Sequence, residues 1–346
     1  FATTDGKRLR MKKIFFACML MILAVGCRQK ASRTADVSGI DLDIKIARFD
    51  RDFWALRDSK DLGADLDRLF AKYPRFAPVY FGGVVYFGNS RDTILRVLPK
   101  FFSDSVAKQL YTDALKRYEK VSDIEKQLTN AFKRGKYFFP QLSVPQIIMC
   151  VSLLNQNMIV ADSLIAAGID KYLGADYRLY SQGADNYDYL IRNWKPEKLV
   201  SDYISVWLLT EFPYTPANER LLDEMIYKGK ILYLTALLLP DEKPNIVMGY
   251  SDEQWQWCKE NEKAMWQTLI ENRHLFSNDY TLMIKYLNDS PFTQPFTQES
   301  PGRAGQYIGW QIVDAYMSRN SDITPQQLID NTDAQQILEK SGYNPR

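Results

Sequence analysis

Apolar and polar residues alternate strictly over residues 40–48, with isoleucine or leucine at every second position up to 46. A period of two is typical of a strand with one buried face. After this segment the apolar residues recur at every third or fourth position, which predicts helices with one buried face. In the first half of the chain these helices are expected at residues 49–58, 61–73, 90–101, 103–119 and 122–135. The apolar, glycine-containing stretch 79–88 fits neither period, and we expect it to be irregular.

Short apolar runs return over residues 146–168, where Asn155-Gln156-Asn157 and Ala161-Asp162-Ser163 separate them. Apolar runs broken by turn-forming residues predict a small meander of strands. The helical period then continues at residues 196–211, 217–236, 251–273, 278–288, 302–319, 325–331 and 333–341. The pattern shows no internal repeat and no clear linker. We therefore expect one α+β domain over residues 39–346, mostly helical and with a small sheet.

Three of the predicted helices begin with residues that can satisfy free backbone N–H groups. A serine or threonine with glutamine three positions later can form a capping box. Proline suits the first helical position because it lacks an N–H group. These signals are Ser251 with Gln254, Thr324-Pro325 with Gln327, and Ser300-Pro301.

Residues 11–27 have the order of a secretory signal that ends on a cysteine. Lys12 and Lys13 precede the apolar run 14–25, and small residues lead from it to Cys27. The run is too short to cross a bilayer comfortably, since about 20 residues are needed. This arrangement resembles a bacterial lipobox, so Cys27 is predicted to carry the lipid and to become the mature N-terminus. A plain signal peptide cut nearby and an uncleaved anchor are the alternatives.

The domain boundaries follow from this signal. Residues 1–27 are interpreted as upstream residues plus the signal peptide, because residues 1–10 precede a good initiator, Met11. Residues 28–38 are small and polar, and they predict a flexible tether. The folded domain is expected to begin at residue 39.

Charge and composition narrow the kinds of partner. Lys and Arg total 44 against 42 Asp and Glu, which gives a net charge of +2. Such a balance produces no field for attracting nucleic acid, so no nucleic-acid partner is expected. The hydrophobic fraction of 46% is ample for a core, and the 21 Tyr, 18 Phe and 7 Trp are expected mainly to pack it. Some of these rings could also line a groove.

Few residues offer metal or nucleophilic chemistry. His274 is the single histidine of the sequence, whereas a histidine-based zinc site needs two or three. Its place near a predicted helix end favours an interaction with the helix C-terminus over catalysis. Once Cys18 leaves with the signal and Cys27 is lipidated, Cys150 and Cys258 remain, and two buried thiols are favoured over a disulfide. We predict no metal and no other cofactor.

Five phrases in the second half of the chain carry a family resemblance. They are IDKYLGADYRLY (169–180), LLDEMIYKGKILYLTALLLP (221–240), MGYSDEQWQWCKENEKAMW (248–266), ESPGRAGQYIGWQIVDAYM (299–317) and DAQQILEKSGYNPR (333–346). With the lipobox, these phrases resemble the gliding-motility lipoprotein B (GldB) family of Bacteroidetes, from about residue 40 to the C-terminus. The resemblance implies an envelope lipoprotein associated with the gliding machinery and the type IX secretion apparatus. The family also occurs in species that do not glide.

The family is also distantly similar to predicted zinc-dependent proteases. Those carry HExxH on one helix and a glutamate ligand on the next, in a phrase like EGLAEYF. The matching phrase here is 228–233, with Lys228 at the position of the ligand glutamate, and the preceding helix 199–212 contains no histidine. The resemblance therefore implies a degenerate zinc-metallopeptidase-like scaffold that is not an enzyme.

Three charged residues are candidates for the former zinc cleft. Lys228 and Glu262 share the apolar faces of their helices. Arg303 falls in the first turn of the predicted helix 302–319, where the helix dipole does not favour a cation. We expect Glu262 to pair with Lys228 or Arg303, because a buried carboxylate needs a partner. Alternatively, Lys228 reaches solvent and Glu262 lies at the exposed margin of its stripe.

Two other groups of residues have both a structural and a functional interpretation. Gly302, Gly305 and Gly309 fall in one predicted helix, where a glycine costs about 1 kcal/mol. Close packing against another helix explains them better than contact with a ligand. Asp170 and Asp176 follow the predicted meander and could form a paired-carboxylate hydrolase, but acidic residues near turns commonly bind local backbone.

The favoured function is a non-catalytic subunit of envelope machinery, held to a membrane by lipid and bound to envelope proteins of the gliding or secretion apparatus. In this phylum, lipoproteins exported to the cell surface usually carry acidic residues just after the cysteine. Arg28-Gln29-Lys30 contains none, which predicts the periplasmic face of the outer membrane. Two alternatives stay open: an atypical peptidase-like hydrolase that uses the inherited cleft, and a peptidoglycan- or peptide-binding module that uses an aromatic groove.

Overall fold

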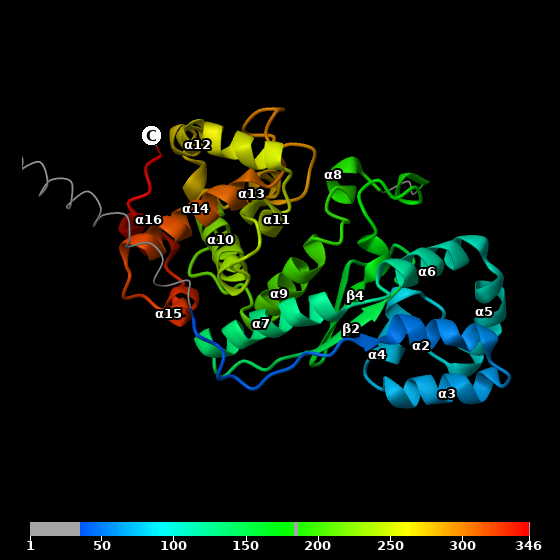
Figure 1. The fold of residues 1–346 in the computed structure, drawn as a ribbon. Coiled ribbons are helices and arrows are strands. Elements are labelled where there is room, and N and C mark those ends of the chain that lie inside the picture. Colours follow the sequence, from blue (N-terminus) through cyan, green and yellow to red (C-terminus); the bar gives the residue numbers. More distant parts are fainter. Residues whose placement is uncertain (1–34, 183–185, 346) are drawn as a thin grey trace, which may run out of the picture. The chain divides into compact units, whose positions relative to one another are not determined.

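The structure, a computed structural model, describes residues 35–182 and 186–345. The predicted lipidation site Cys27, the signal peptide and most of the tether lie outside the described residues. From Val37 onward the chain forms one compact unit, in which helices predominate around a small sheet (Figure 1). The predicted α+β class is confirmed at this level. Among the described residues, no helix is both long enough and apolar enough to cross a membrane.

The sheet of the described chain has the strand order β1-β2-β4-β3. Its strands are β1 (Ala47–Arg48), β2 (Gln146–Cys150), β3 (Met158–Ala161) and β4 (Leu164–Gly168). β1 and β4 both run parallel to β2, whereas β3 is antiparallel to β4. The predicted meander is therefore wrong, because only β3 and β4 form a hairpin. β4 is buried at every position, as expected for a strand covered on both faces.

The loop after β2 explains why no meander forms. Asp170, fully buried beyond β4, accepts hydrogen bonds from the backbone N–H groups of Ser152 and Leu154 at 2.7 and 2.6 Å. The loop passes so close to Gly168 that a Cβ there would lie 2.2 Å from the carbonyl oxygen of Gln156. After β2 the chain therefore passes the end of β4 and forms β3 on the other side of β4. The carboxylate that directs this crossing comes later in the sequence than the loop itself.

The segment before β1 keeps the predicted alternation but has a different partner. Ile44 and Ile46 are buried, whereas Asp43 and Lys45 are exposed. Their backbone N–H groups donate to Thr129 Oγ1 and Glu125 Oε1, both at 3.0 Å, on helix α7 (Ser122–Phe138). Only the two residues of β1 join the sheet. Periodicity predicted the buried face correctly, while polar side chains of a helix took the place of a neighbouring strand.

The helices before β2 enclose an aromatic cluster. They are α2 (Phe49–Ala55), α3 (Leu62–Lys72), α4 (Phe76–Val79), α5 (Arg91–Ser103), α6 (Ser105–Arg117) and α7. Phe53 is fully buried, and six other ring centroids lie within 6.0 Å of its own. We call these rings the aromatic cluster: Phe49, Phe53, Tyr80, Phe81, Phe101, Phe102 and Tyr111. Residues 80–84, which we expected to be irregular, form a π-helical turn that supplies two of the rings.

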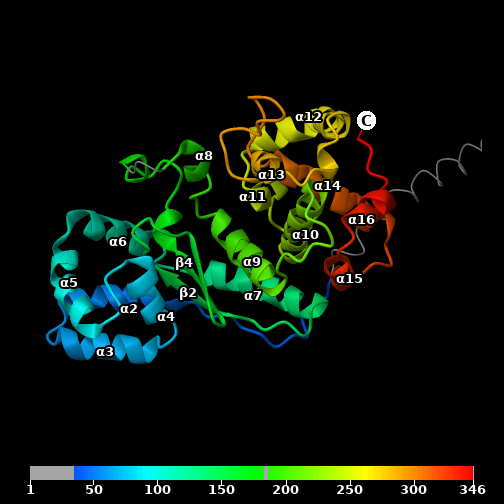
Figure 2. The same ribbon diagram turned by 180° about the vertical axis from the view of Figure 1, so that it is seen from behind.

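The chain after β4 is helical. Its helices are α8 (Asp188–Ile191), α9 (Lys198–Glu211), α10 (Leu221–Leu238), α11 (Pro244–Met248), α12 (Asp252–Glu271), α13 (Tyr280–Leu287), α14 (Ala304–Arg319), α15 (Pro325–Asp330) and α16 (Ala334–Ser341). Both ribbon views show α7 and α9 beside the sheet, with α10 lying against α14 (Figures 1 and 2). α10 and α14 form the most extensive helix–helix contact of the described chain.

Glycines allow this contact to be close. A Cβ on Gly309 would lie 2.0 Å from the carbonyl oxygen of Met225, and one on Gly229 would lie 2.3 Å from the carbonyl carbon of Gly309. Gly305 similarly faces the backbone of Tyr286 on α13, where a Cβ would be 2.9 Å from the carbonyl oxygen. The predicted helix packing of Gly305 and Gly309 is confirmed, whereas Gly302 lies before α14 begins.

Two of the three predicted helix starts are confirmed. Capping boxes form at Ser251 and Thr324. The start at Ser300-Pro301 is wrong, since α14 begins only at Ala304. The N–H group of Ala304 donates to Thr293 Oγ1 at 2.9 Å, and the Ser300 hydroxyl instead accepts from the Thr293 N–H at 3.0 Å. A side chain from the preceding loop has taken over the capping role.

Candidate functional site

Glu262 on α12 is held by two tyrosines. Its carboxylate oxygens accept hydrogen bonds from the hydroxyls of Tyr307 on α14 and Tyr343 after α16, both at 2.8 Å. Burial, reinforced by the neighbouring carboxylate, raises the pKa of both tyrosines, so they remain neutral donors. The predicted pairing of Glu262 with Lys228 or Arg303 is replaced by these two hydroxyls.

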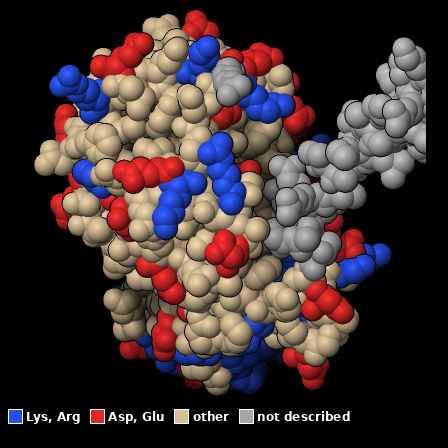
Figure 3. Space-filling model, turned by 90° about the vertical axis from the view of Figure 1, so that its left-hand side faces the viewer, with Lys and Arg blue, Asp and Glu red and all other residues tan. Residues whose placement is uncertain are grey.

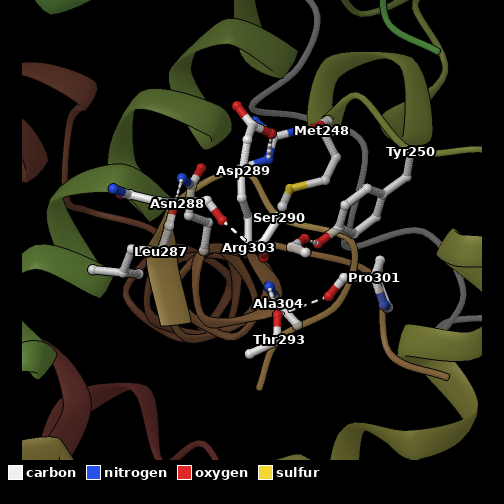
Figure 4. A network of polar contacts seen from close by, with 12 residues as sticks. Met248, Tyr250, Leu287, Asn288, Asp289, Ser290, Thr293, Pro301, Arg303 and Ala304 are labelled. Carbon is white, nitrogen blue, oxygen red and sulfur yellow. Dashed lines mark hydrogen bonds and ion pairs between the residues drawn. The ribbon is translucent and has the colours of Figure 1, made fainter. Parts of the chain in front are cut away.

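Arg303 joins two other segments (Figure 4). Its Nη2 donates to the carbonyl of Met248 at 2.8 Å, and its Nε lies 3.0 Å from Asp289 Oδ1. The residue lies just before α14 instead of in its first turn, in the left-handed backbone region with a φ of 62°. From there the guanidinium reaches the C-terminal end of α11, where exposed carbonyls favour a cation. The unfavourable dipole predicted for Arg303 is thereby avoided.

Lys228 on α10 is half-buried and takes part in no ion pair within the described chain. Its ammonium lies 5.7 Å from the ring centroid of the adjacent Tyr227. This placement fits the alternative expectation that Lys228 extends toward solvent. The structure thus gives the three candidate charges three different sets of neighbours.

Two of the family phrases meet around these residues. Residues 248–266 and 299–317 touch through Met248 and Arg303, and again through Glu262 and Tyr307. The hydroxyl of Tyr250 also donates to the carbonyl of Gly302 at 2.6 Å. The phrases that carry the resemblance therefore encode one network of contacts that joins α11, α12 and α14.

The other chemically capable residues have structural partners. Asp170 is fully buried and Asp176 is exposed, so the two do not form a carboxylate pair. Burial raises the pKa of Asp170, while its hydrogen bonds from Ser152 and Leu154 act in the opposite direction. His274 lies in a short 3₁₀ turn after α12, where its Nδ1 is 2.8 Å from the hydroxyl of Tyr286. That hydroxyl takes the place of the helix C-terminus that we expected as its partner.

The two cysteines of the described chain, Cys150 and Cys258, are free and buried, which confirms the prediction of two separate thiols. Burial raises the pKa of both thiols. Most aromatic side chains also serve the core: the twelve largest fully buried side chains of the described residues are all aromatic. The high aromatic content is therefore explained mainly by packing.

A pocket of about 290 Å³ lies between the end of α9 and α10, and no sequence motif signals it. It is lined by residues 211–216, by α10 and by residues 329–332 and Ala334. Tyr214 and Tyr227 form its aromatic side, with ring centroids 4.8 Å apart. The Tyr227 hydroxyl donates to the carbonyl of Phe212 at 2.8 Å, which fixes the ring.

Lys230 is the buried cation of this pocket. The residue is only 5% exposed, and its Nζ donates to the carbonyl of Asn331. Burial lowers the pKa of Lys230 to about 8, against the opposing charge of Asp330. A buried amine beside two tyrosines can hold the polar end of a small ligand or peptide. A second lysine two positions after Lys228, within an otherwise apolar stretch, was the available sequence signal.

A family model described as gliding motility protein GldB matches residues 30–345. The chain belongs to the GldB family. Membership implies a lipoprotein associated with gliding motility, and the family name agrees with the predicted envelope anchor. No curated protein and no solved structure matches the chain.

Proposed function

We propose that this chain is a lipid-anchored, non-catalytic subunit of the envelope machinery that serves gliding and type IX secretion. The observation that carries the proposal is the way its chemically capable side chains are used. Glu262 links α12 to α14 and to the C-terminal segment, and Arg303 links the start of α14 to α11. Asp170 links β2 to the turn after β4. Each of these groups joins segments of the chain.

A catalytic acid or base must reach a substrate proton within hydrogen-bond distance. The buried Asp170 and the doubly hydrogen-bonded Glu262 have their oxygens directed to protein donors. The resemblance to predicted zinc-dependent proteases supports this proposal, because Lys228 would replace a ligand glutamate. An ammonium at that position opposes a divalent cation, which prefers anionic oxygen or neutral nitrogen ligands. The inherited cleft therefore serves as scaffold.

The proposed location is the periplasmic face of the outer membrane, with lipid at Cys27 and envelope proteins as partners. Basic and acidic side chains are interspersed over most of the face drawn in Figure 3, in line with the net charge of +2. Such a mixed surface suits contact with proteins better than binding of nucleic acid.

The proposal is tested by replacing the chromosomal gene in the source bacterium. We expect Cys27→Ser to abolish incorporation of labelled fatty acid, to release the protein from membranes and to impair gliding or type IX secretion. Glu262→Gln and His274→Gln should keep that function at normal protein level, measured by immunoblot. Loss of function in either of these two variants, with the protein still folded and abundant, would argue for a chemical role and against a scaffold.

A second candidate function is binding of a peptide or peptidoglycan stem, favoured by the pocket that contains Lys230. Calorimetry of the purified full chain with soluble muropeptides measures it directly. Tyr227→Ala should weaken such binding, because it removes half of the aromatic side, while Tyr137→Ala, an exposed tyrosine elsewhere, is the matched control. Equal affinities for both variants would exclude this pocket as the binding site.

A further inference from the structure

Arg192, directly after α8, is half-buried, but its guanidinium binds no group within the described chain. Its Nε is the one buried side-chain polar atom of the described residues that lacks a hydrogen-bond partner. Burial, and next the charge of Arg303, lower the pKa of Arg192. Leaving a charged donor unpaired in a partly buried position destabilises a fold. The position therefore calls for a partner from outside the chain.

Two other polar side chains, those of Asn193 and Arg303, meet close to Gly249. Gly249, which follows α11 with a φ of 75°, is the point of convergence. A Cβ there would lie 2.9 Å from Arg303 Nη2 and 3.1 Å from the amide nitrogen and oxygen of Asn193. Asn193 directly follows Arg192, and its side-chain amide forms no hydrogen bond with another described residue. Arg303 and Asn193 thus meet beside a backbone without a side chain, and the guanidinium of Arg192 is near enough for the charge of Arg303 to act on it.

The local charge indicates what these groups would bind. Arg192 and Arg303 each carry one positive charge, and Asp289, which pairs with Arg303, supplies one negative charge. The nearby Tyr250 is fully buried and stays neutral, since burial raises its pKa. One positive charge is left uncompensated, which matches a singly charged anion. A guanidinium also offers parallel N–H groups at the spacing of carboxylate oxygens.

We propose that Arg192, Asn193 and Arg303 form a binding site for a carboxylate group. Arg192 is the principal donor because no protein group uses its guanidinium, whereas Arg303 is already shared with Asp289 and Met248. The carboxylate can belong to a small organic acid, a peptide C-terminus or an acidic side chain. Phosphate fits less well, because its second charge would be uncompensated. This site is separate from the pocket of Lys230 and does not depend on the proposed scaffold role.

The test measures thermal unfolding of the purified full chain at constant ionic strength, adjusted with sodium chloride. The probes are acetate, trialanine, trialanine amide, an acetylated and amidated Ala-Asp-Ala, and inorganic phosphate. We expect acetate and at least one of the two carboxylate peptides to raise Tm, with no rise from trialanine amide and a smaller rise from phosphate. A response to trialanine alone identifies a terminal carboxylate, and a response to Ala-Asp-Ala identifies a side-chain carboxylate.

Arg192→Met separates a ligand-binding role from a structural one. Removing an unpaired buried charge should raise the Tm of the ligand-free protein and abolish the response to carboxylates. Arg192→Lys keeps the positive charge but loses the paired N–H groups of the guanidinium. The affinity for the responding probe should therefore fall by about tenfold or more. Arg96→Gln, an exposed arginine on α5, is the matched control and should respond as the wild type does.

Several results would overturn the proposal. They are no rise in Tm with any carboxylate, an undiminished rise in Arg192→Met, or a larger rise with phosphate than with carboxylates. A lower Tm of ligand-free Arg192→Met would also overturn it, because that result would give Arg192 a structural partner. If Arg192→Met does not fold, the affinity of Arg192→Lys decides, and an unchanged affinity rejects the site.

Discussion

The aromatic cluster and the contact between α10 and α14 are two opposite ways to build a core. Around Phe53, large rings fill the space between short helices, with six neighbouring centroids within 6.0 Å. At Gly309, the absence of a side chain lets two backbones approach, so that a Cβ would be 2.0 Å from a carbonyl oxygen. The aromatic cluster is stabilised by large side chains that fill its interior. The α10–α14 contact is stabilised by close backbone packing, which requires glycines without side chains.

The two regions also differ in how they use polar side chains. In the aromatic cluster the rings fill the interior, and the fully buried Asp50 on α2 pairs with Arg48 just before that helix. α14 uses small residues for close approach on one part of its surface, while Tyr307 and the preceding Arg303 bind other segments. The proposed carboxylate site lies beside this second region.

Removing a ring from the aromatic cluster should reduce the stability of the protein more than any other change proposed here. Phe53→Ala is expected to lower the free energy of unfolding by about 4 kcal/mol, since a buried phenylalanine loses its transfer energy and leaves a cavity. Denaturant unfolding followed by circular dichroism measures this change. Val106→Ala, at a half-exposed position on α6, is the control and should change stability by less than about 0.5 kcal/mol. Similar losses for both variants would show that the cluster does not act as a filled core.

Adding volume at the α10–α14 contact should have the next largest effect. Gly309→Ala is expected to destabilise by about 3 kcal/mol, because the new methyl group forces two backbones apart. Gly83→Ala is the matched control, since nothing lies within 4 Å of a Cβ at that position. The same unfolding experiment applies. If both substitutions proved neutral, the close approach of α10 and α14 would be refuted.

Lys230 should make stability depend on pH. Its pKa is about 8 in the folded protein, below the ordinary value of 10.5. Between these values the unfolded chain binds more protons, so stability rises as pH increases through this window. Lys230→Met should stabilise the protein at pH 7 by on the order of 2 kcal/mol, after allowance for its lost hydrogen bond. This advantage should shrink as pH rises from 8 toward 10.

Lys228→Met provides the control for that experiment, because Lys228 lies on the same helix but does not line the pocket. Chemical unfolding at several pH values compares the two variants with the wild type. The buried tyrosines contribute equally to the pH dependence of all three proteins. The difference between their curves of stability against pH therefore measures the contribution of the lysine. An advantage of Lys230→Met that stays constant with pH would mean that its amine is not buried as the structure shows.

The smallest effect is expected at Glu262. Tyr343→Phe removes one of its two hydroxyl donors and should cost about 1 kcal/mol, while the edge-to-face contact of that ring with Trp266 remains. Tyr307→Phe together with Tyr343→Phe should cost more than the sum of the two single changes, because the carboxylate then loses both donors. Tyr137→Phe, on the exposed side of α7, is the control. Strict additivity would show that Glu262 is satisfied by solvent.

Part of the candidate site could be predicted from the sequence. Lys228, Glu262 and Arg303 stand out as charges on apolar helix faces or at a helix end, but their partners could not be deduced. Tyr343, one donor to Glu262, lies 81 residues away. Lys230 carried only a weak signal and Arg192 carried none, because burial of a single long side chain leaves no periodic trace.

The sequence by itself determined what depends on near neighbours. Its apolar periods located most helices to within a few residues, and the capping boxes at Ser251 and Thr324 formed as expected, since each uses groups within one turn. The tertiary structure alone decided the order of the strands, the cap of α14 and the neighbours of each charge. Folding brings distant segments next to Asp170, Thr293 and Tyr307. The pattern of apolar and polar residues along the chain does not predict which distant segments will meet.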